Sequence, residues 1–140
     1  MLETISNICK RHGVADLYVF GSRGAEIAAR IRGKSMNFQT DSASDVDFAV
    51  SPVDQSQFGP LQRVSLATEL EDLFDAPRVD LVVLPEAEPF LALEIIRGEL
   101  LYTNDPDRQA RQELYILRQA GDLMPLKKQR IRMILEESAR

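Results

Sequence analysis

The feature that most constrains this sequence is an alternation of short β-rich runs with segments suited to helices. The runs Asp16–Phe20, Asp45–Val50 and Val79–Leu84 are apolar and rich in β-branched or aromatic residues, which favours strands. Between them, residues 23–32 contain good helix formers, and residues 61–74 carry apolar side chains at helical spacing. We therefore expect an α/β (α+β) fold, in which a small mixed β-sheet is covered by helices.

The nearly continuous apolar run of Val79–Leu84 is typical of a central strand that is covered on both faces. An N-terminal helix ending at Gly13 is expected because apolar residues from Leu2 to Cys9 recur at helical spacing. We further expect a helix from Pro89 to about Arg97, a short edge strand at Leu100–Tyr102, a loop over residues 33–44, and a helical tail from Asp107 that is interrupted near residues 121–125.

Length and composition exclude several classes of protein. A chain of 140 residues predicts one domain with a core of its own. The single cysteine, Cys9, cannot form an internal disulfide, and with the single histidine, His12, it cannot build a cysteine- or histidine-rich zinc site. The sequence shows no signal peptide and no apolar stretch near the ~20 residues of a membrane span. We expect a cytoplasmic protein without membrane contact.

The charge of the chain is unevenly distributed. The net charge is −5, which argues against direct nucleic-acid binding, because that requires clustered basic residues. Residues 107–140 hold 8 basic and 5 acidic residues, a net charge of +3, so the remaining body carries −8. This tail has apolar residues compatible with packing on the domain, with a homo-oligomeric contact or with a different partner.

The dipeptide Gly21-Ser22 lies where the first predicted strand gives way to a helix. Glycine allows the backbone to approach a ligand closely, and the first turn of a helix presents unpaired N–H groups that bind anions. The Ser22 hydroxyl adds one more donor, so a phosphate group fits this turn. The alternative is a tight structural turn in which Ser22 caps the helix.

Asp45 and Asp47 open the second predicted strand and, two residues apart, point to the same face. Paired carboxylates repel each other, and a divalent cation such as Mg²⁺ removes that cost. Asp80 lies within the apolar third strand, where it could be a third metal ligand or a base, or could form an ion pair with Arg78 or Arg63. Together with the Gly-Ser turn, the three carboxylates form a pattern typical of two-metal nucleotidyl transfer.

Three runs carry a resemblance to a known family: Val19-Phe20-Gly21-Ser22-Arg23, Ser44-Asp45-Val46-Asp47-Phe48-Ala49-Val50 and Arg78-Val79-Asp80-Leu81-Val82. They resemble the minimal nucleotidyltransferases of the DNA polymerase beta superfamily, near the kanamycin nucleotidyltransferase-like domains. With the short length and the run from Phe90 to Tyr102, the chain looks like the MntA-type antitoxins of HEPN/MNT toxin–antitoxin pairs.

The resemblance implies a nucleotidyltransferase domain over residues 1–105 and a helical C-terminal extension over residues 106–140. It implies an enzyme that uses Mg²⁺, in a two-metal site, and a nucleoside triphosphate, ATP, to transfer AMP to a tyrosine of a HEPN ribonuclease toxin. Carried over by motif, the metal-binding and catalytic residues are Asp45, Asp47 and Asp80, and the nucleotide-binding residues are Gly21, Ser22, Arg23 and Ser44.

One departure from the family pattern is visible. Ser22 and Asp45 are separated by 22 residues, where the family has about ten. The added segment includes Arg30, Arg32 and Lys34, which could reach nucleotide phosphates or a partner but are more often a solvated helix face. Two other functions stay open at this point: a non-catalytic binding antitoxin, and a nucleotidyltransferase acting on small molecules such as aminoglycosides.

Overall fold

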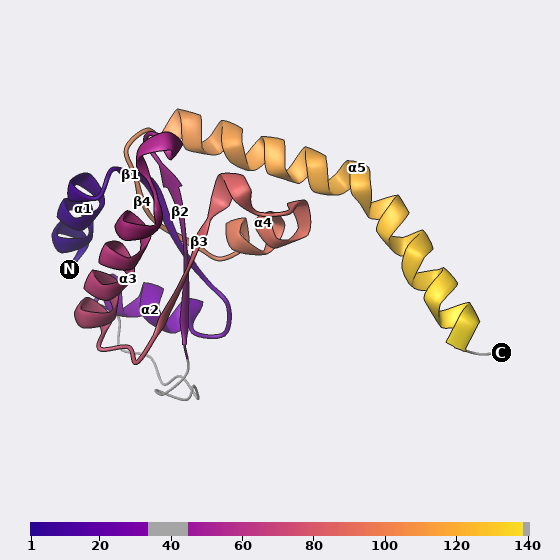
Figure 1. Cartoon of the computed structure of the whole chain (residues 1–140), viewed down its shortest axis with the longest axis horizontal. Coiled ribbons are helices and arrows are strands. Elements are labelled where there is room, and N and C mark those ends of the chain that lie inside the picture. The colour runs from indigo at the N-terminus through magenta and orange to yellow at the C-terminus, as the bar shows by residue number, and fades with distance from the viewer. Residues whose placement is uncertain (34–44, 139–140) are drawn as a thin grey trace.

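The computed structural model describes residues 1–33 and 45–138. Within them lies a mixed sheet with helices on both faces (Figure 1), as expected from the sequence. The elements in chain order are α1 (Leu2–Arg11), β1 (Val14–Phe20), α2 (Gly24–Ile31), β2 (Val46–Pro52), a 3₁₀ turn at Gln55–Gln57, α3 (Pro60–Phe74), β3 (Val79–Val83), a 3₁₀ turn at Leu84–Glu86, α4 (Pro89–Ile96), β4 (Glu99–Thr103) and α5 (Pro106–Ser138). No helix in this part of the chain is long and apolar enough to cross a membrane.

The strands of the sheet lie in the order β3-β2-β1-β4. β1 pairs antiparallel with both β2 and β4, whereas β2 and β3 run parallel. The prediction that Val79–Leu84 forms a central strand is wrong, because among the described strands β3 lies at the edge of the sheet and pairs with β2 alone. Its apolar character has another cause: Leu81 packs on the core of one sheet face and Val82 on the core of the other.

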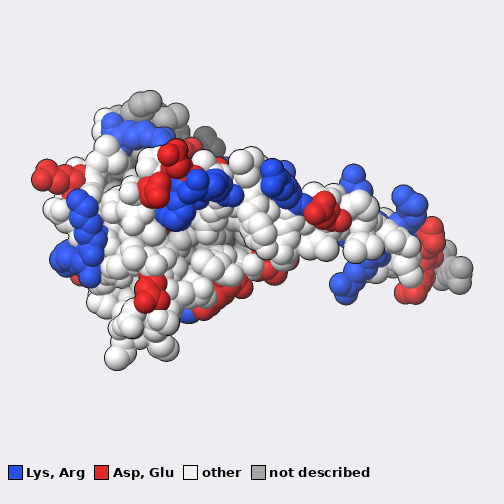
Figure 2. Space-filling model, turned by 90° about the horizontal axis from the view of Figure 1, so that it is seen from above, with Lys and Arg blue, Asp and Glu red and all other residues white. Residues whose placement is uncertain are grey.

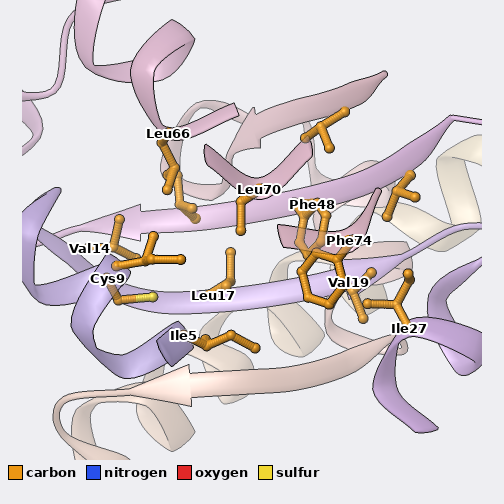
Figure 3. Close-up of a cluster of buried hydrophobic side chains, with 14 of the residues drawn as sticks. Ile5, Cys9, Val14, Leu17, Val19, Ile27, Phe48, Leu66, Leu70 and Phe74 are labelled. Carbon is orange, nitrogen blue, oxygen red and sulfur yellow. The ribbon is translucent and has the colours of Figure 1, made fainter. Parts of the chain in front are cut away.

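The two faces of the sheet bury separate cores because β1 alternates its side chains between them. Leu17 and Val19 belong to the core under α1, α2 and α3 (Figure 3), where the rings of Phe48 and Phe74 lie 5.5 Å apart. Tyr18 and Phe20 belong to the smaller core under α4 and the first half of α5. All seven residues of β1 are buried, so packing on both sides holds the strand in place. The position of its C-terminal end is thereby fixed.

The tail predicted from Asp107 is a single helix, α5, and the predicted interruption near residues 121–125 is wrong. Pro125 lies inside the helix, where it removes one hydrogen bond and costs about 3 kcal/mol relative to a good helix former. The strong helix formers that follow it, such as Leu126, Lys127 and Lys128, continue the helix beyond the proline. The second half of α5 projects past the body of the molecule (Figure 1).

Hydrogen bonds from buried polar groups hold the first half of α5 against the sheet. The Asp16 carboxylate on β1 is fully buried and accepts two hydrogen bonds from the Arg108 guanidinium, at 2.7 and 2.8 Å. Beside it, the Tyr18 hydroxyl donates to Glu113 at 2.9 Å and accepts from Gln109 at 2.6 Å. These bonds satisfy polar groups that the sheet would otherwise bury without partners, so they specify where α5 docks.

We expect Arg108→Ala to lower the free energy of unfolding by about 2–3 kcal/mol. The substitution leaves the Asp16 carboxylate buried without its cation, a loss that costs about 3–5 kcal/mol in a fully buried pair, and the partial exposure of Arg108 reduces it. Urea unfolding of Arg108→Ala and of the exposed control Arg111→Ala measures the effect. Equal stability of the two variants would contradict this role for the ion pair.

Candidate functional site

The sheet pairs two of the predicted carboxylates at one of its ends, and the third lies directly before this pair. In the strand register, Asp47 of β2 lies opposite Phe20 of β1 on one side and opposite Asp80 of β3 on the other. Asp45 lies directly before β2 and is exposed. The C-terminal end of β1 and the N-terminal ends of β2 and β3 therefore meet at one place, where the three predicted acidic residues gather.

Gly21 places the β1–α2 turn directly against Asp47. Its φ angle is +76°, a left-handed conformation that favours glycine. A Cβ atom built on Gly21 would lie 2.3 Å from the Asp47 Oδ2 atom, closer than any side chain allows. Two motifs that lie 26 residues apart in the sequence thus touch, and the contact requires the absence of a side chain.

The helix after this turn begins at Gly24, whose N–H donates to the Gly21 carbonyl at 3.2 Å. Ser22 is exposed between the two glycines, at the N-terminal end of α2. Arg23 is buried, and its Nε donates to the Glu26 carboxylate at 2.9 Å. Of the predicted nucleotide-binding residues, Gly21 and Ser22 thus lie at the exposed turn, whereas Arg23 is buried. Ser44 falls outside the described residues.

The environment of Asp47 disfavours its charged form. Burial raises the pKa of Asp47 above its ordinary value, and the nearby carboxylates of Asp80, Asp45 and Glu94 raise it further. Without a cation nearby, the negative charge of Asp47 is repelled by these neighbouring carboxylates. The fourth contributor, Glu94 on α4, was not among the residues predicted from the sequence.

Arg78 supplies the positive charge that is present among these carboxylates. Its guanidinium lies 3.2 Å from Asp80 and 4.0 Å from Asp45, so one of the ion pairs considered for Asp80 is formed. The other candidate partner, Arg63, is paired with Glu86 instead. As the side chains stand, no group of three His, Cys, Asp or Glu residues in the described ranges is arranged to hold a metal ion.

The donor set nonetheless suits a magnesium ion. Hard carboxylate oxygens are the ligands that Mg²⁺ prefers, and the ion takes only one or two of them before it adds water and phosphate oxygens. A bound cation would offset the repulsion between Asp47 and its neighbouring carboxylates, so this repulsion favours cation binding. Arg78 does not block this, because its side chain is 69% exposed and can swing into solvent.

A pocket of about 430 Å³ opens beside the Gly21-Ser22 turn. One wall is the turn with the first residues of α2, and the other is formed by Glu94 near the end of α4, Arg97 directly after it and Glu99 at the start of β4. Gly98 lets this wall approach, since a Cβ there would lie 2.4 Å from the Val19 carbonyl oxygen and 2.8 Å from the Phe20 Cβ. In the sequence, Gly98 indicates only the end of a helix, so the close packing of α4 against the end of β1 was not predicted.

Two other basic residues of the segment after Ser22 have structural partners. Arg30 donates to the Phe74 carbonyl at the end of α3 at 3.1 Å, and Arg32 forms an ion pair with Glu99 at 3.3 Å. Lys34 lies outside the described residues. Arg97, directly after α4, is the basic side chain that lines the pocket.

Comparison with known proteins identifies the family and the fold of the chain. Residues 3–107 match the family model described as Polymerase beta, Nucleotidyltransferase. No curated protein sequence matches the chain significantly. Among solved structures, the chain is similar to one from a mutant of the MntA–HpeT toxin–antitoxin complex, with a TM-score of 0.65 and 21% identity, covering 100% of this chain and 99% of that one.

Two further structures share the fold over the whole chain. A toxin–antitoxin structure with AMP-PNP gives a TM-score of 0.60 at 21% identity, covering 99% of this chain and 98% of that one. A structure of the tri-AMPylated Shewanella oneidensis HEPN toxin in complex with an MNT antitoxin gives a TM-score of 0.60 at 20% identity, covering 99% and 96%.

Proposed function

The chain belongs to the polymerase beta nucleotidyltransferase family, and we propose that it transfers AMP from ATP to a protein hydroxyl, a tyrosine of a HEPN-type toxin. One observation carries the proposal: the Gly21 turn lies against Asp47, which is paired in register with Asp80. The turn proposed to bind phosphate thus lies beside a carboxylate pair, and phosphoryl transfer requires these two parts together. By neutralising its target the protein would act as an antitoxin, and a reaction that consumes ATP would take place in the cytoplasm.

We assign the following roles to the residues of the site. Asp45, Asp47 and Asp80 would hold Mg²⁺, which neutralises charge on the attacking and leaving oxygens when it is bound. The N–H groups at the start of α2 and the Ser22 hydroxyl would hold the triphosphate in line. The acceptor oxygen attacks the α-phosphorus, the bond to the β-phosphate oxygen breaks, and pyrophosphate leaves. Asp80 would help to take up the proton of the acceptor hydroxyl.

The openness of the site favours a protein as acceptor. The side chains of Asp45 and Asp80 are 44% and 41% exposed, so the carboxylates lie at the surface rather than in a closed cavity. Small-molecule acceptors need a concave pocket that buries most of their surface. The solved toxin–antitoxin structures that share the fold, one of them with an AMPylated HEPN toxin, support the same choice.

We expect Arg97→Ala to weaken ATP binding about tenfold while AMP binding changes little. Arg97 lines the pocket beside the Gly21-Ser22 turn, where a guanidinium would make charge-assisted hydrogen bonds to the β- or γ-phosphate. Titration calorimetry with AMP-PNP and with AMP gives the ratio, and Arg118→Ala on the exposed surface of α5 is the control. An unchanged preference for the triphosphate would remove Arg97 from the site.

Label position tests the proposed reaction. The purified chain is incubated with Mg²⁺ and the product of the adjacent gene, in parallel with ATP labelled at the α- or at the γ-phosphate. Transfer of AMP labels the neighbouring protein from α-labelled ATP only, and the Asp45→Asn/Asp47→Asn variant abolishes the label. Label from γ-labelled ATP would indicate a kinase, and a stable complex without any label would indicate a binding antitoxin.

A further inference from the structure

The outer half of α5 exposes large apolar side chains on a helix that the described body does not support. Leu126 is 62% exposed, Met133 55% and Ile134 52%, and the helix here projects past the domain (Figure 1). A single helix of about 13 residues is marginal in water unless its apolar face is covered. An exposed apolar stripe of this length indicates a contact surface.

One face of this projecting helix has a definite order of side chains. From the inner end outward it carries Leu126, Arg130, Met133, Ile134 and Glu137, at helical spacing. These residues line a shallow trough of about 400 Å³. We call this face the tail face.

The trough continues inward to the domain. A second hollow, of about 370 Å³, lies between the start of α4 and α5 and is lined by Phe90 and Leu123 together with Leu126 and Arg130 of the tail face. Lys127 lies over the Phe90 ring, 4.1 Å from its centroid, which holds α5 against α4 at this point. The tail face therefore forms one surface that ends against the wall of the domain.

We propose that the tail face binds the tail face of a second copy of this chain, with the two helices antiparallel. The order along the face is basic, apolar, acidic: Arg130, then Met133 and Ile134, then Glu137. When two such faces meet antiparallel, Arg130 of each copy lies near Glu137 of the other at both ends, and the apolar residues meet in the middle. A parallel arrangement would bring like charges together and is disfavoured.

The arrangement closes on itself. A two-fold axis near residues 133 and 134 relates the two copies, so both use the same surface and assembly stops at the dimer. With Arg130 opposite Glu137, Ser138 of one copy lies beside residue 129 of the other, so the two helices overlap over residues 129–138. Figure 2 shows the projecting helix with its basic side chains and, near its end, its acidic ones.

The contact is small, and this sets the expected strength of the dimer. Residues 129–138 span only about 15 Å of helix, which places the interface in the class of weak, concentration-dependent contacts. The two domains lie at opposite ends of the helix pair, so their nucleotide pockets stay open. Dimerisation is therefore independent of ATP and of catalysis.

Sedimentation velocity of the full chain between about 1 and 300 µM tests the proposal. We expect the wild type to shift from its monomer mass of 15.8 kDa toward twice that mass as its concentration rises. Arg130→Glu alone and Glu137→Arg alone place like charges at both ends of the contact, and each should weaken dimerisation about tenfold or more. The control Arg132→Glu, on the opposite side of the helix, should leave it unchanged.

Mixing the two variants provides the decisive result. A chain with Arg130→Glu and a chain with Glu137→Arg carry complementary charges only toward each other, so an equal mixture should recover the wild-type association. A wild type that stays monomeric at all concentrations would overturn the proposal. So would a dimer that ignores both substitutions, or a mixture that fails to associate.

Discussion

Asp47→Asn is expected to reduce nucleotidyl transfer by about a thousandfold or more. Asp47 is the carboxylate that lies against the Gly21 turn and feels the charges of Asp80 and Asp45, so its replacement removes a charge from the proposed metal site. The cation that it would help to hold supplies several kcal/mol of transition-state stabilisation, and each 1.4 kcal/mol is worth about a factor of ten in rate. Transfer of label from α-labelled ATP measures the loss.

The same substitution should make the metal-free protein more stable at neutral pH. The pKa of Asp47 is raised in the folded state, so folding favours the protonated carboxyl and is opposed by the charged one. The free energy of unfolding should therefore fall as the pH rises through this raised pKa, and Asp47→Asn should remove that fall. Thermal unfolding between pH 4 and 8 in the presence of a chelator tests it.

Glu71→Gln, on α3, is the control for removing a charge elsewhere, because the glutamine Oε1 atom still accepts the hydrogen bond from the Val79 N–H. Loss of activity together with a gain in stability would identify Asp47 as a residue kept for function. Lower stability of Asp47→Asn at pH 7, with metal removed, would contradict our account of its electrostatics.

Gly21→Ala should abolish transfer and lower the free energy of unfolding by about 2 kcal/mol or more. Two costs combine at this position. The φ angle of +76° costs an alanine about 1–2 kcal/mol, and its Cβ would lie 2.3 Å from the Asp47 Oδ2 atom. Either the turn or the Asp47 side chain has to move, and both belong to the proposed site.

Gly13→Ala separates these two costs. Gly13 has a φ angle of +67°, but a Cβ there would meet no atom within 4 Å. It should therefore show the backbone cost alone and keep full activity. Urea unfolding and the transfer assay on both variants make the comparison, and an active Gly21→Ala protein would show that the turn does not need to approach Asp47 closely.

Local patterns in the sequence predicted most of the fold. The strands and helices lie close to their expected positions because apolar periodicity and breakers such as Gly13 and Pro77 act locally. The position of β3 at the sheet edge was not predicted, since strand order depends on long-range packing. The continuity of α5 through Pro125 was not predicted, because a proline by itself indicates a helix break. In the structure, the strong helix formers on both sides outweigh the unfavourable helix propensity of this proline.

For the site, the sequence indicated the strand-borne carboxylates but not their surroundings. The pairing of Asp47 with Asp80 follows from two neighbouring strands in register. Glu94 and Arg97 reach the pocket only because Gly98 lets α4 pack against the end of β1, and a lone glycine carries no such signal in the sequence. The ion pair of Arg78 with Asp80 was one of two alternatives that only the structure could separate.

The intact mass of the protein encoded by the adjacent gene, which we propose to be the HEPN-type target, tests the central claim most directly. The two proteins are incubated with ATP and Mg²⁺, and the neighbour is then weighed by mass spectrometry. We predict that its mass rises by one or more AMP units, that a tyrosine carries the addition, and that Asp45→Asn/Asp47→Asn abolishes the gain. An unchanged mass with the wild-type chain, while the two proteins still form a stable complex, would contradict the proposed transfer to a protein hydroxyl.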